Sequence, residues 1–174
     1  MNSQIQKLQK LQKLAYILRV LVLATIALSV FYLVYQYVKN DALVLSTSEL
    51  FTQLWQSEQS SHPVLALTLL PSFAILFLAG YWLQRLLANF QQGQFFCDDA
   101  IKSFFWLIWI KVISIGVTVV EDIAVAYYHS QFFEETKLVI GVDLGETLTI
   151  IFLLLVAHLL KQAKAIEAEN KEFI

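Results

Sequence analysis

The sequence predicts an all-α integral membrane protein: a four-helix bundle with a short outer interfacial helix and a cytoplasmic C-terminal helix extension. Its 174 residues are 58% hydrophobic and only 15% charged, whereas soluble domains carry about 25% charged residues. Four apolar runs each reach the roughly 17–25 residues that a membrane-spanning helix needs. We therefore expect one transmembrane domain over 1–174, with spans at about 14–38, 64–88, 103–127 and 138–162.

The first apolar run begins after a lysine-containing segment, as the apolar core of a signal peptide does. A signal's apolar core is about 7–15 residues long and ends at a small-residue cleavage site. Here the run covers 14–38, is interrupted only by Arg19, and is followed by no Ala-x-Ala site. We expect a retained first span. The preceding segment 4–14 either extends this helix or lies on anionic lipid.

Basic residues are distributed unevenly along the chain, and this distribution predicts a topology. Lysine and arginine near span ends mark the cytoplasmic side of a membrane. The side that we expect to be the outer one has only Lys39 and Lys137 near its span ends. We therefore expect both termini in the cytoplasm and the loops 39–63 and about 127–137 on the outer side. The nine basic residues expected on the cytoplasmic side are Lys7, Lys10, Lys13, Arg19, Arg85, Lys102, Lys161, Lys164 and Lys171.

The outer loop 39–63 contains a pattern that is typical of a short helix. Ser46 and Glu49 have capping-box spacing. An apolar face follows, formed by Leu50, Phe51, Leu54 and Trp55. This helix either lies on the outer membrane surface or packs on top of the bundle. Pro63 suits the first turn of span 2, where its missing N–H does no harm.

The connection between spans 2 and 3 is short and should turn at Gly93. Asp98 or Asp99 can cap the start of the third helix. Cys97 falls at the membrane edge, as an unmodified thiol or as a lipidation site. Because it is the single cysteine, an intramolecular disulfide and a cysteine-based metal cluster are excluded.

Each span has a narrow polar or small face, which we expect to point into the bundle because lipid offers polar groups no partner. Trp106, Trp109, Ile113 and Val120 lie on the opposite side of span 3 and suit lipid. The expected inward faces are Thr25, Ser29, Tyr32 and Gln36 in span 1; Thr68, Ser72 and Ala79 in span 2; Lys111, Ser114, Thr118 and Asp122 in span 3; and Asp143, Glu146, Thr147, His158 and Lys161 in span 4.

Acidic residues near the outer ends of spans 3 and 4 form the candidate intramembrane polar site. Intramembrane carboxylates often mark a path for a cation or proton. The alternative is that most of them lie among lipid headgroups. Pro71 should free the carbonyl of Leu67 and kink span 2 beside them. Lys111 either faces inward, near His158 or a serine, or extends its long stem towards the inner membrane surface. The candidate residues are Glu121, Asp122, Asp143, Glu146, Lys111 and Tyr32.

Several classes of function are disfavoured. A net charge of −2 argues against nucleic-acid binding, which usually requires a basic patch. No HxxxH or HExxH spacing supports a metal site around His62 or His129. The ionisable residues include no nucleophile–base pair. We expect no catalytic residues, no metal and no cofactor.

One sequence motif resembles a known family. The stretch Leu86-Leu-Ala-Asn-Phe-Gln-Gln-Gly-Gln-Phe-Phe, followed by Asp98-Asp-Ala-Ile-Lys, is similar to the motif before span 3 in the DUF2975 family. The ending 165–174 resembles the acidic, Asn-containing tail of that family. At Cys97 to Ala100 relatives often have Thr or Ser, then Glu-Asn. The resemblance implies a bacterial inner-membrane protein without an established activity, in many cases encoded beside a small helix-turn-helix regulator.

Two functions therefore compete. The first is a non-enzymatic membrane protein that acts through interactions, signalling to a cytoplasmic transcriptional regulator through the hairpin 88–103 and the tail 161–174. The second is a small ion- or ligand-sensing or transport bundle that uses the outer acidic residues. The expected partners are the lipid bilayer, a cytoplasmic regulator and a second copy of the chain.

Overall fold

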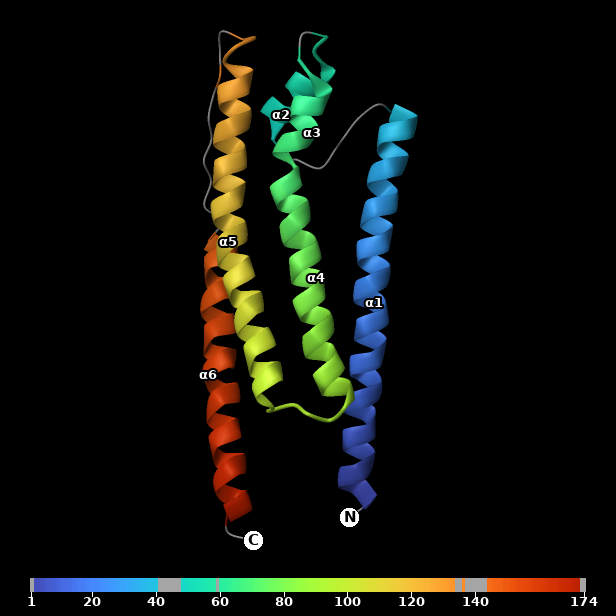
Figure 1. Ribbon diagram of the computed structural model, residues 1–174, viewed down its shortest axis with the longest axis vertical. Helices are drawn as coiled ribbons and strands as arrows, with labels where there is room; N and C mark the ends of the chain where they lie inside the picture. Colours follow the sequence, from blue (N-terminus) through green and yellow to red (C-terminus); the bar gives the residue numbers. More distant parts are fainter. Residues whose placement is uncertain (1, 41–47, 59, 134–135, 137–143, 173–174) are drawn as a thin grey trace. The chain divides into compact units, whose positions relative to one another are not determined.

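The computed structural model describes residues 2–40, 48–58, 60–133, 136 and 144–172, and these residues form helices and turns without a strand (Figure 1). The fold is all-α, as predicted. Four segments are long and apolar enough to cross a membrane: Gln9–Lys39, His62–Gln91, Asp98–His129 and Leu144–Ile166. The helices are α1 (Asn2–Asn40), α2 (Glu49–Gln56), α3 (His62–Thr68), α4 (Leu70–Gln91), α5 (Asp98–His129) and α6 (Leu144–Glu172).

The described helices overlap the expected spans and extend beyond the ends of most of them. Helix α1 begins at Asn2, so the basic segment 4–14 continues the first span as a helix. Helix α6 continues to Glu172, which confirms the predicted C-terminal helix extension. The first six residues expected in span 4, 138–143, lie outside the described residues.

The chain divides into two compact units. Unit 1 comprises Met1–Ala24, Phe77–Val112 and Asp143–Ile174, and unit 2 comprises Thr25–Leu76 and Ile113–Val142. Helices α1, α4 and α5 therefore contribute to both units, whereas α2 and α3 belong to unit 2 and α6 belongs to unit 1.

In unit 1, side-chain contacts tie α4 to α1 and α5 to α6. Arg19 of α1 donates from Nε to Gln84 Oε1 over 3.1 Å and from Nη1 to Gln91 Oε1 over 2.8 Å. Gln84 Nε2 donates in return to the Arg19 carbonyl oxygen over 2.8 Å. Arg19 is therefore a link between two helices rather than a side chain that reaches out to the headgroups.

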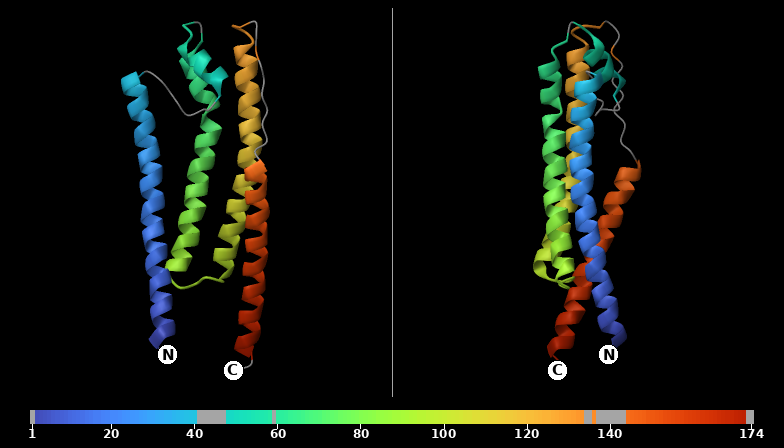
Figure 2. Two further views of the ribbon diagram at one scale, coloured as in Figure 1. Left: turned by 180° about the vertical axis from the view of Figure 1, so that it is seen from behind. Right: turned by 90° about the vertical axis from the view of Figure 1, so that its right-hand side faces the viewer.

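Helix α6 runs antiparallel to the first half of α5, as Figures 1 and 2 show. Two ion pairs define their register. Lys111 pairs with Glu146 near the start of α6, and Lys164 near its end pairs with Asp98 at the start of α5. The same end of unit 1 thus holds the α4–α5 turn and the last turns of α6.

The turn between α4 and α5 forms at Gly93, as predicted. Gly93 has φ 77°, a left-handed conformation that favours glycine. Its N–H donates to the Phe90 carbonyl and the Gln94 N–H donates to the Asn89 carbonyl, each over 3.0 Å. These bonds satisfy carbonyls that the end of α4 would otherwise leave unpaired.

The prediction that an aspartate caps α5 is wrong. The residue before the helix is Cys97, and the Ala100 N–H donates to Cys97 Sγ over 3.3 Å. Asp98 and Asp99 instead occupy the first turn of α5. There their negative charges interact favourably with the positive end of the helix dipole.

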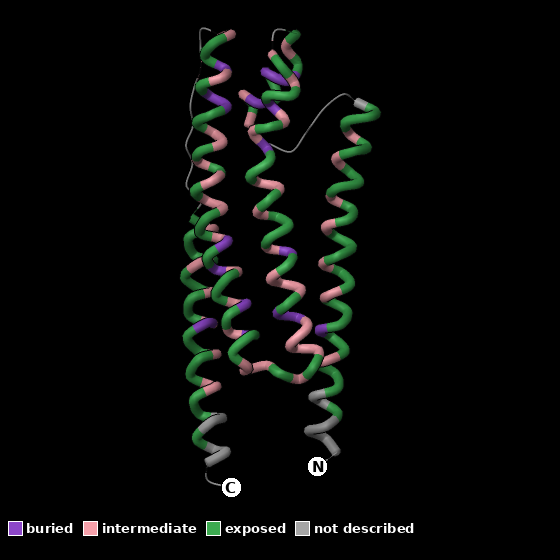
Figure 3. The backbone as a smooth tube through the Cα atoms, in the orientation of Figure 1, coloured by how far each residue is buried: buried purple, intermediate pink, exposed green. Residues whose placement is uncertain are grey.

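In unit 2, the short helix α2 packs against protein through its apolar face, which favours the second of the two alternatives for this helix. Leu54 is completely buried, and the opposite side chains Glu49, Thr52 and Gln56 are exposed. Figure 3 shows buried segments on α2, on α3 and near the end of α5. The cluster consists of Phe51, Leu54, Trp55, Leu65, Leu69 and Val125, with Leu50, Phe73, Tyr128, Phe132 and Phe133 packed against it.

The cap of α2 also differs from the predicted one. Ser48, not Ser46, is the N-cap residue, and its side chain makes no capping bond. Ser46 itself lies outside the described residues. The hydrophobic contacts of α2, rather than a capping box, therefore account for its position.

Span 2 is interrupted between α3 and α4, at Leu69. Pro63 lies in the first turn of α3, as predicted. Pro71 has no N–H to donate to the Leu67 carbonyl, and its ring would clash with that oxygen in a continuous helix. The Leu69 N–H turns back instead to the carbonyls of Ala66 and Leu67, and α4 begins afresh at Leu70. The proline thus breaks the helix rather than only bending it.

Candidate functional site

The candidate residues Lys111 and Glu146 form an ion pair within unit 1. Lys111 Nζ donates to Glu146 Oε1 over 2.7 Å, and the two side chains are 32% and 39% exposed. Lys111 lies thirteen residues after Asp98, or about 20 Å along α5. Since Glu146 lies in the first turn of α6, α6 begins beside the middle of α5. Its carboxylate also lies at the positive end of its own helix.

The pairing explains how a lysine can lie so deep in a membrane-spanning helix. An isolated ammonium group is costly among acyl chains, whereas a carboxylate partner offsets much of that cost. The sequence predicted an inward Lys111 but placed it near His158 or a serine. His158 is exposed on α6 and contacts Gln162 of its own helix, with 3.5 Å between nitrogen atoms.

The candidate residue Glu121 has a separate role within unit 2, at the break in span 2. Its Oε1 accepts from the Ser72 N–H over 3.1 Å, and its Oε2 accepts from Ser72 Oγ–H over 2.7 Å. Ser72 lies in the first turn of α4, where backbone N–H groups lack intrahelical acceptors. Glu121 therefore caps α4 from the neighbouring helix α5.

This cap follows from the proline. In an uninterrupted helix the Ser72 N–H would donate to the Thr68 carbonyl, but α3 ends at Thr68. Amide groups left unpaired in lipid cost several kcal/mol each. A carboxylate is a strong acceptor for such a donor and also complements the dipole of α4.

The other candidate residues have different surroundings. Asp122 is half-buried next to Glu121 on α5. Tyr32 is 53% exposed, and its hydroxyl accepts from Gln36 Nε2 of the same helix over 2.7 Å. Asp143 lies outside the described residues. Among the residues that are described, no three His, Cys, Asp or Glu side chains form a group suited to a metal ion.

The predicted inward face of span 4 is only partly correct. Glu146 is half-buried, but Thr147, His158 and Lys161 are exposed. Small and apolar side chains continue the inward face instead, and Ala157 is 1% exposed. Most of the less exposed positions of α6 follow steps of three and four residues, with Val156 and Ala163 adjoining them: Glu146, Ile150, Leu153, Ala157, Leu160 and Lys164.

The predicted inward face of span 1 is also only partly correct. Ser29 and Gln36 are half-buried, but Thr25 and Tyr32 are exposed. On span 3 the side expected to face lipid is exposed, with Trp109 at 59% and Val120 at 65%.

A polar cluster around His129 is the main feature that sequence reasoning missed. His129 is 1% exposed, and its Nε2 lies 3.0 Å from Gln53 Oε1 of α2 while its Nδ1 lies 3.0 Å from Thr136 Oγ1. Its ring stacks on Phe133, with centroids 4.3 Å apart. A single histidine after an apolar run gave no signal of burial.

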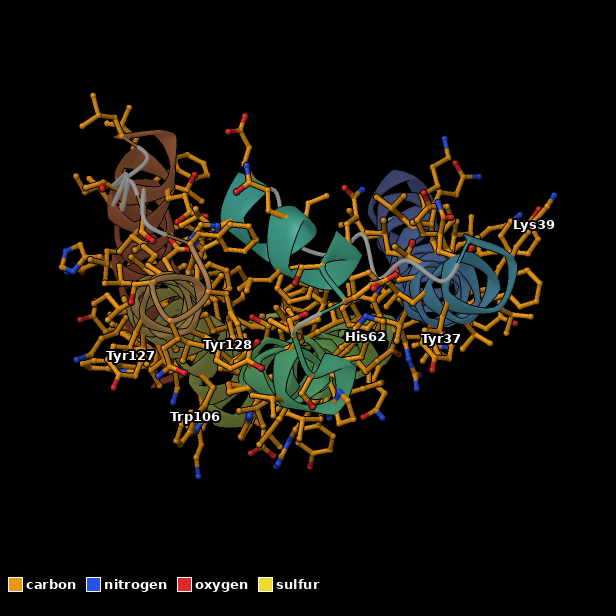
Figure 4. All side chains as sticks on the ribbon, turned by 90° about the horizontal axis from the view of Figure 1, so that it is seen from above. Tyr37, Lys39, His62, Trp106, Tyr127 and Tyr128 are labelled. Carbon is orange, nitrogen blue, oxygen red and sulfur yellow. The ribbon has the colours of Figure 1, made fainter. Side chains whose placement is uncertain are left out.

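A second link in the same unit joins α5 to α3. Tyr128 points toward α3 and Tyr127 points away from it (Figure 4). The Tyr128 hydroxyl accepts from the Ser61 N–H over 3.0 Å, whereas Tyr127 is 69% exposed. His62 stacks on Trp55, with centroids 4.4 Å apart, and its Nε2 lies 3.0 Å from the Trp55 carbonyl oxygen. These contacts hold α2, α3 and the end of α5 together.

Comparison with known proteins gives a family but no characterised relative. No curated protein matches the chain. No solved structure matches it either. A family described as "Protein of unknown function (DUF2975)" matches residues 52–174, which include the motif before α5 and the C-terminal tail. With four apolar helices and a match over most of its length, the chain belongs to the DUF2975 family.

Proposed function

We propose that this protein is a non-catalytic multipass membrane protein that signals through protein interactions. The distribution of basic residues supports an orientation with both termini and the α4–α5 turn in the cytoplasm of a bacterium, and spans in its inner membrane. The partner in this proposal is a cytoplasmic transcriptional regulator. Its docking surface is the cytoplasmic end of unit 1, formed by the α4–α5 turn and the extension of α6.

The contact between Asp98 and Lys164 is the observation that carries this proposal. It joins the α4–α5 turn to the α6 extension, so two segments far apart in sequence present one surface. The Asp98 side chain remains 91% exposed. Beyond Lys164, α6 continues for eight residues, or about 12 Å. A charged, projecting helix end of this kind suits recognition by a soluble protein.

The proposal can be tested in living cells with a photo-crosslinking amino acid placed at Ile166 or at Ile151. Both side chains are 58% exposed on α6, but Ile166 is the last residue of the apolar segment Leu144–Ile166, four residues past the expected end of span 4 at 162, whereas Ile151 lies well within that segment. The proposal predicts a discrete crosslink to a soluble protein at Ile166 and crosslinks to lipid at Ile151. The absence of a protein crosslink at Ile166 would reject the extension as a docking surface.

A charge exchange separates a formed surface from simple electrostatic attraction. Asp98→Lys and Lys164→Asp should each weaken the crosslink at Ile166, since each leaves like charges side by side. The double variant restores the pair and should restore the crosslink. Lys161→Asp is the matched control, because Lys161 is an exposed lysine one turn away on α6. If the double variant crosslinks no better than the singles, the joined surface is not what the partner recognises.

The alternative is a small ion- or ligand-sensing or transport bundle, and the Lys111–Glu146 pair supports it. Charged residues at membrane depth often belong to ion or proton paths. Reconstitution into liposomes that contain a pH- or cation-sensitive dye tests this function directly. Flux that exceeds that of empty liposomes and falls with Glu146→Gln would favour the alternative. Flux equal to that of empty liposomes would reject transport.

A further inference from the structure

An aromatic cluster formed by Tyr81, Trp82 and Trp106 joins α4 to α5 in unit 1. The Trp82 and Trp106 rings stack with centroids 5.3 Å apart and planes inclined by 12°. Tyr81 meets Trp82 edge-on, with centroids 5.5 Å apart. Trp106 remains 41% exposed although it packs on Trp82. Tryptophan and tyrosine favour the level of lipid headgroups, where an apolar ring meets a polar surface.

Two basic residues, one on each helix, lie on the side of this aromatic cluster that is nearer the α4–α5 turn. Arg85 follows Trp82 by three residues on α4, and Lys102 precedes Trp106 by four residues on α5. Residues three or four apart share a helix face. Since α4 runs toward the α4–α5 turn and α5 runs away from it, both cations lie on the side of the turn. The Arg85 guanidinium carbon is 5.4 Å from the Trp82 ring centroid, which is cation–π distance.

The Arg85 guanidinium retains hydrogen-bonding capacity. Its described polar partner is Asp99, over a long 3.4 Å, and the two side chains are 42% and 63% exposed. A strong charge-assisted bond would measure about 2.7–2.9 Å. Arginine has five N–H donors arranged to grip a phosphate with two of them. Lys102 is exposed, without an ion pair among the described residues.

We propose that this face, formed by Trp82, Arg85, Lys102 and Trp106, binds the phosphate headgroup of an anionic phospholipid. Together with Asp99, the two cations from adjacent helices leave a net charge of +1, which matches the single negative charge of one phosphodiester. The indole rings beneath them meet the glycerol and upper acyl region, and the apolar helix surfaces beyond them accept the acyl chains. This continuity with lipid-facing surface favours a lipid over a free anion. Asp99 competes weakly for Arg85 and so limits the affinity.

Lipid binding to the full-length protein in neutral detergent tests this site. The probes are phosphatidylglycerol and phosphatidylcholine with identical acyl chains, and bound lipids are counted by native mass spectrometry. Phosphatidylglycerol should bind more tightly. Arg85→Ala and Lys102→Ala should each lower that affinity about fivefold, the effect typical of one basic residue near an anionic lipid. Arg85→Lys should retain part of it, because the charge remains and the two-point grip is lost.

Two further variants distinguish a specific site from general attraction. Asp99→Asn should raise the affinity for phosphatidylglycerol but not for phosphatidylcholine, because it removes the competing charge, whereas misfolding would change the binding of both lipids. Lys161→Ala removes an exposed lysine from α6 and should leave the affinity unchanged. Equal binding of the two lipids, or equal losses in Lys161→Ala and Arg85→Ala, would overturn the proposal. Displacement of the lipid by inorganic phosphate would show a simple anion site and would also overturn it.

Discussion

Removing one member of the Lys111–Glu146 pair should destabilise the protein more than removing both. Glu146→Gln leaves the Lys111 ammonium at membrane depth without the carboxylate that lies 2.7 Å away. Lys111→Met leaves the Glu146 carboxylate without the ammonium. In Lys111→Met/Glu146→Gln both side chains are uncharged, so neither member of the pair keeps its charge after losing the other.

The magnitude follows from the depth and exposure of the two groups. A charged side chain at the centre of a membrane helix costs about 2.5–3.5 kcal/mol on an insertion scale. With side chains 32% and 39% exposed and a lysine stem able to bend, part of that cost is relieved. We expect each single variant to lose about 2 kcal/mol of unfolding free energy and the double variant to lose about 1 kcal/mol.

Equilibrium unfolding in mixed micelles, followed by circular dichroism over increasing fractions of a denaturing detergent, measures these losses. All four proteins of the double-mutant cycle are compared under one condition. The reasoning would be refuted if the double variant lost the sum of the single losses to within about 0.5 kcal/mol, since independent sites add to that precision.

Three further perturbations test other contacts. Pro71→Ala supplies the missing N–H for the Leu67 carbonyl and should slow amide hydrogen exchange at the break about tenfold. The control Pro63→Ala, in the first turn of α3, should leave that exchange unchanged. Equal effects of the two variants would show that the break has another cause. Arg19→Leu should lower the unfolding free energy, measured in mixed micelles, by about 1–3 kcal/mol, because it removes two hydrogen bonds from a charged donor to α4. Arg19→Lys should lower it less. If the leucine variant loses no more unfolding free energy than the lysine variant, the assigned bonds are contradicted. His129→Phe keeps the ring packing but removes the hydrogen bond to Gln53 of α2, so amide hydrogen exchange within Glu49–Gln56 should become faster. Unchanged amide exchange would show that hydrophobic contacts alone hold α2.

The helices could be predicted from the sequence because the bilayer imposes a length and a composition on each of them. The apolar spacing in loop 39–63 also identified α2, and the turn at Gly93 followed from the conformational freedom of glycine. These features depend on local sequence. A pattern of residues close together in the chain is sufficient to determine them.

The candidate site depends on contacts between helices, which local patterns do not specify. The polar residues of span 4 predict its inward face, yet Ala157 lies on that face and His158 is exposed beside it. In a membrane, small residues let helices pack closely, so an inward face can consist of small residues as well as polar ones. The partner of Lys111 depended on the register between α5 and α6, and the partner of Glu121 depended on the break at Pro71. The sequence indicated each charged residue but not the group it would meet.

The Glu121 cap has a consequence for biosynthesis. Ser72 and Pro71 are translated about fifty residues before Glu121. A ribosome that adds about 5–20 residues per second therefore needs several seconds to make the acceptor that completes span 2. During that interval this cap cannot exist, and the Ser72 N–H must use water, the translocation machinery or a carbonyl of its own helix. The final form of the second span is thus completed only when the third span joins it, which couples the insertion of one helix to the arrival of the next.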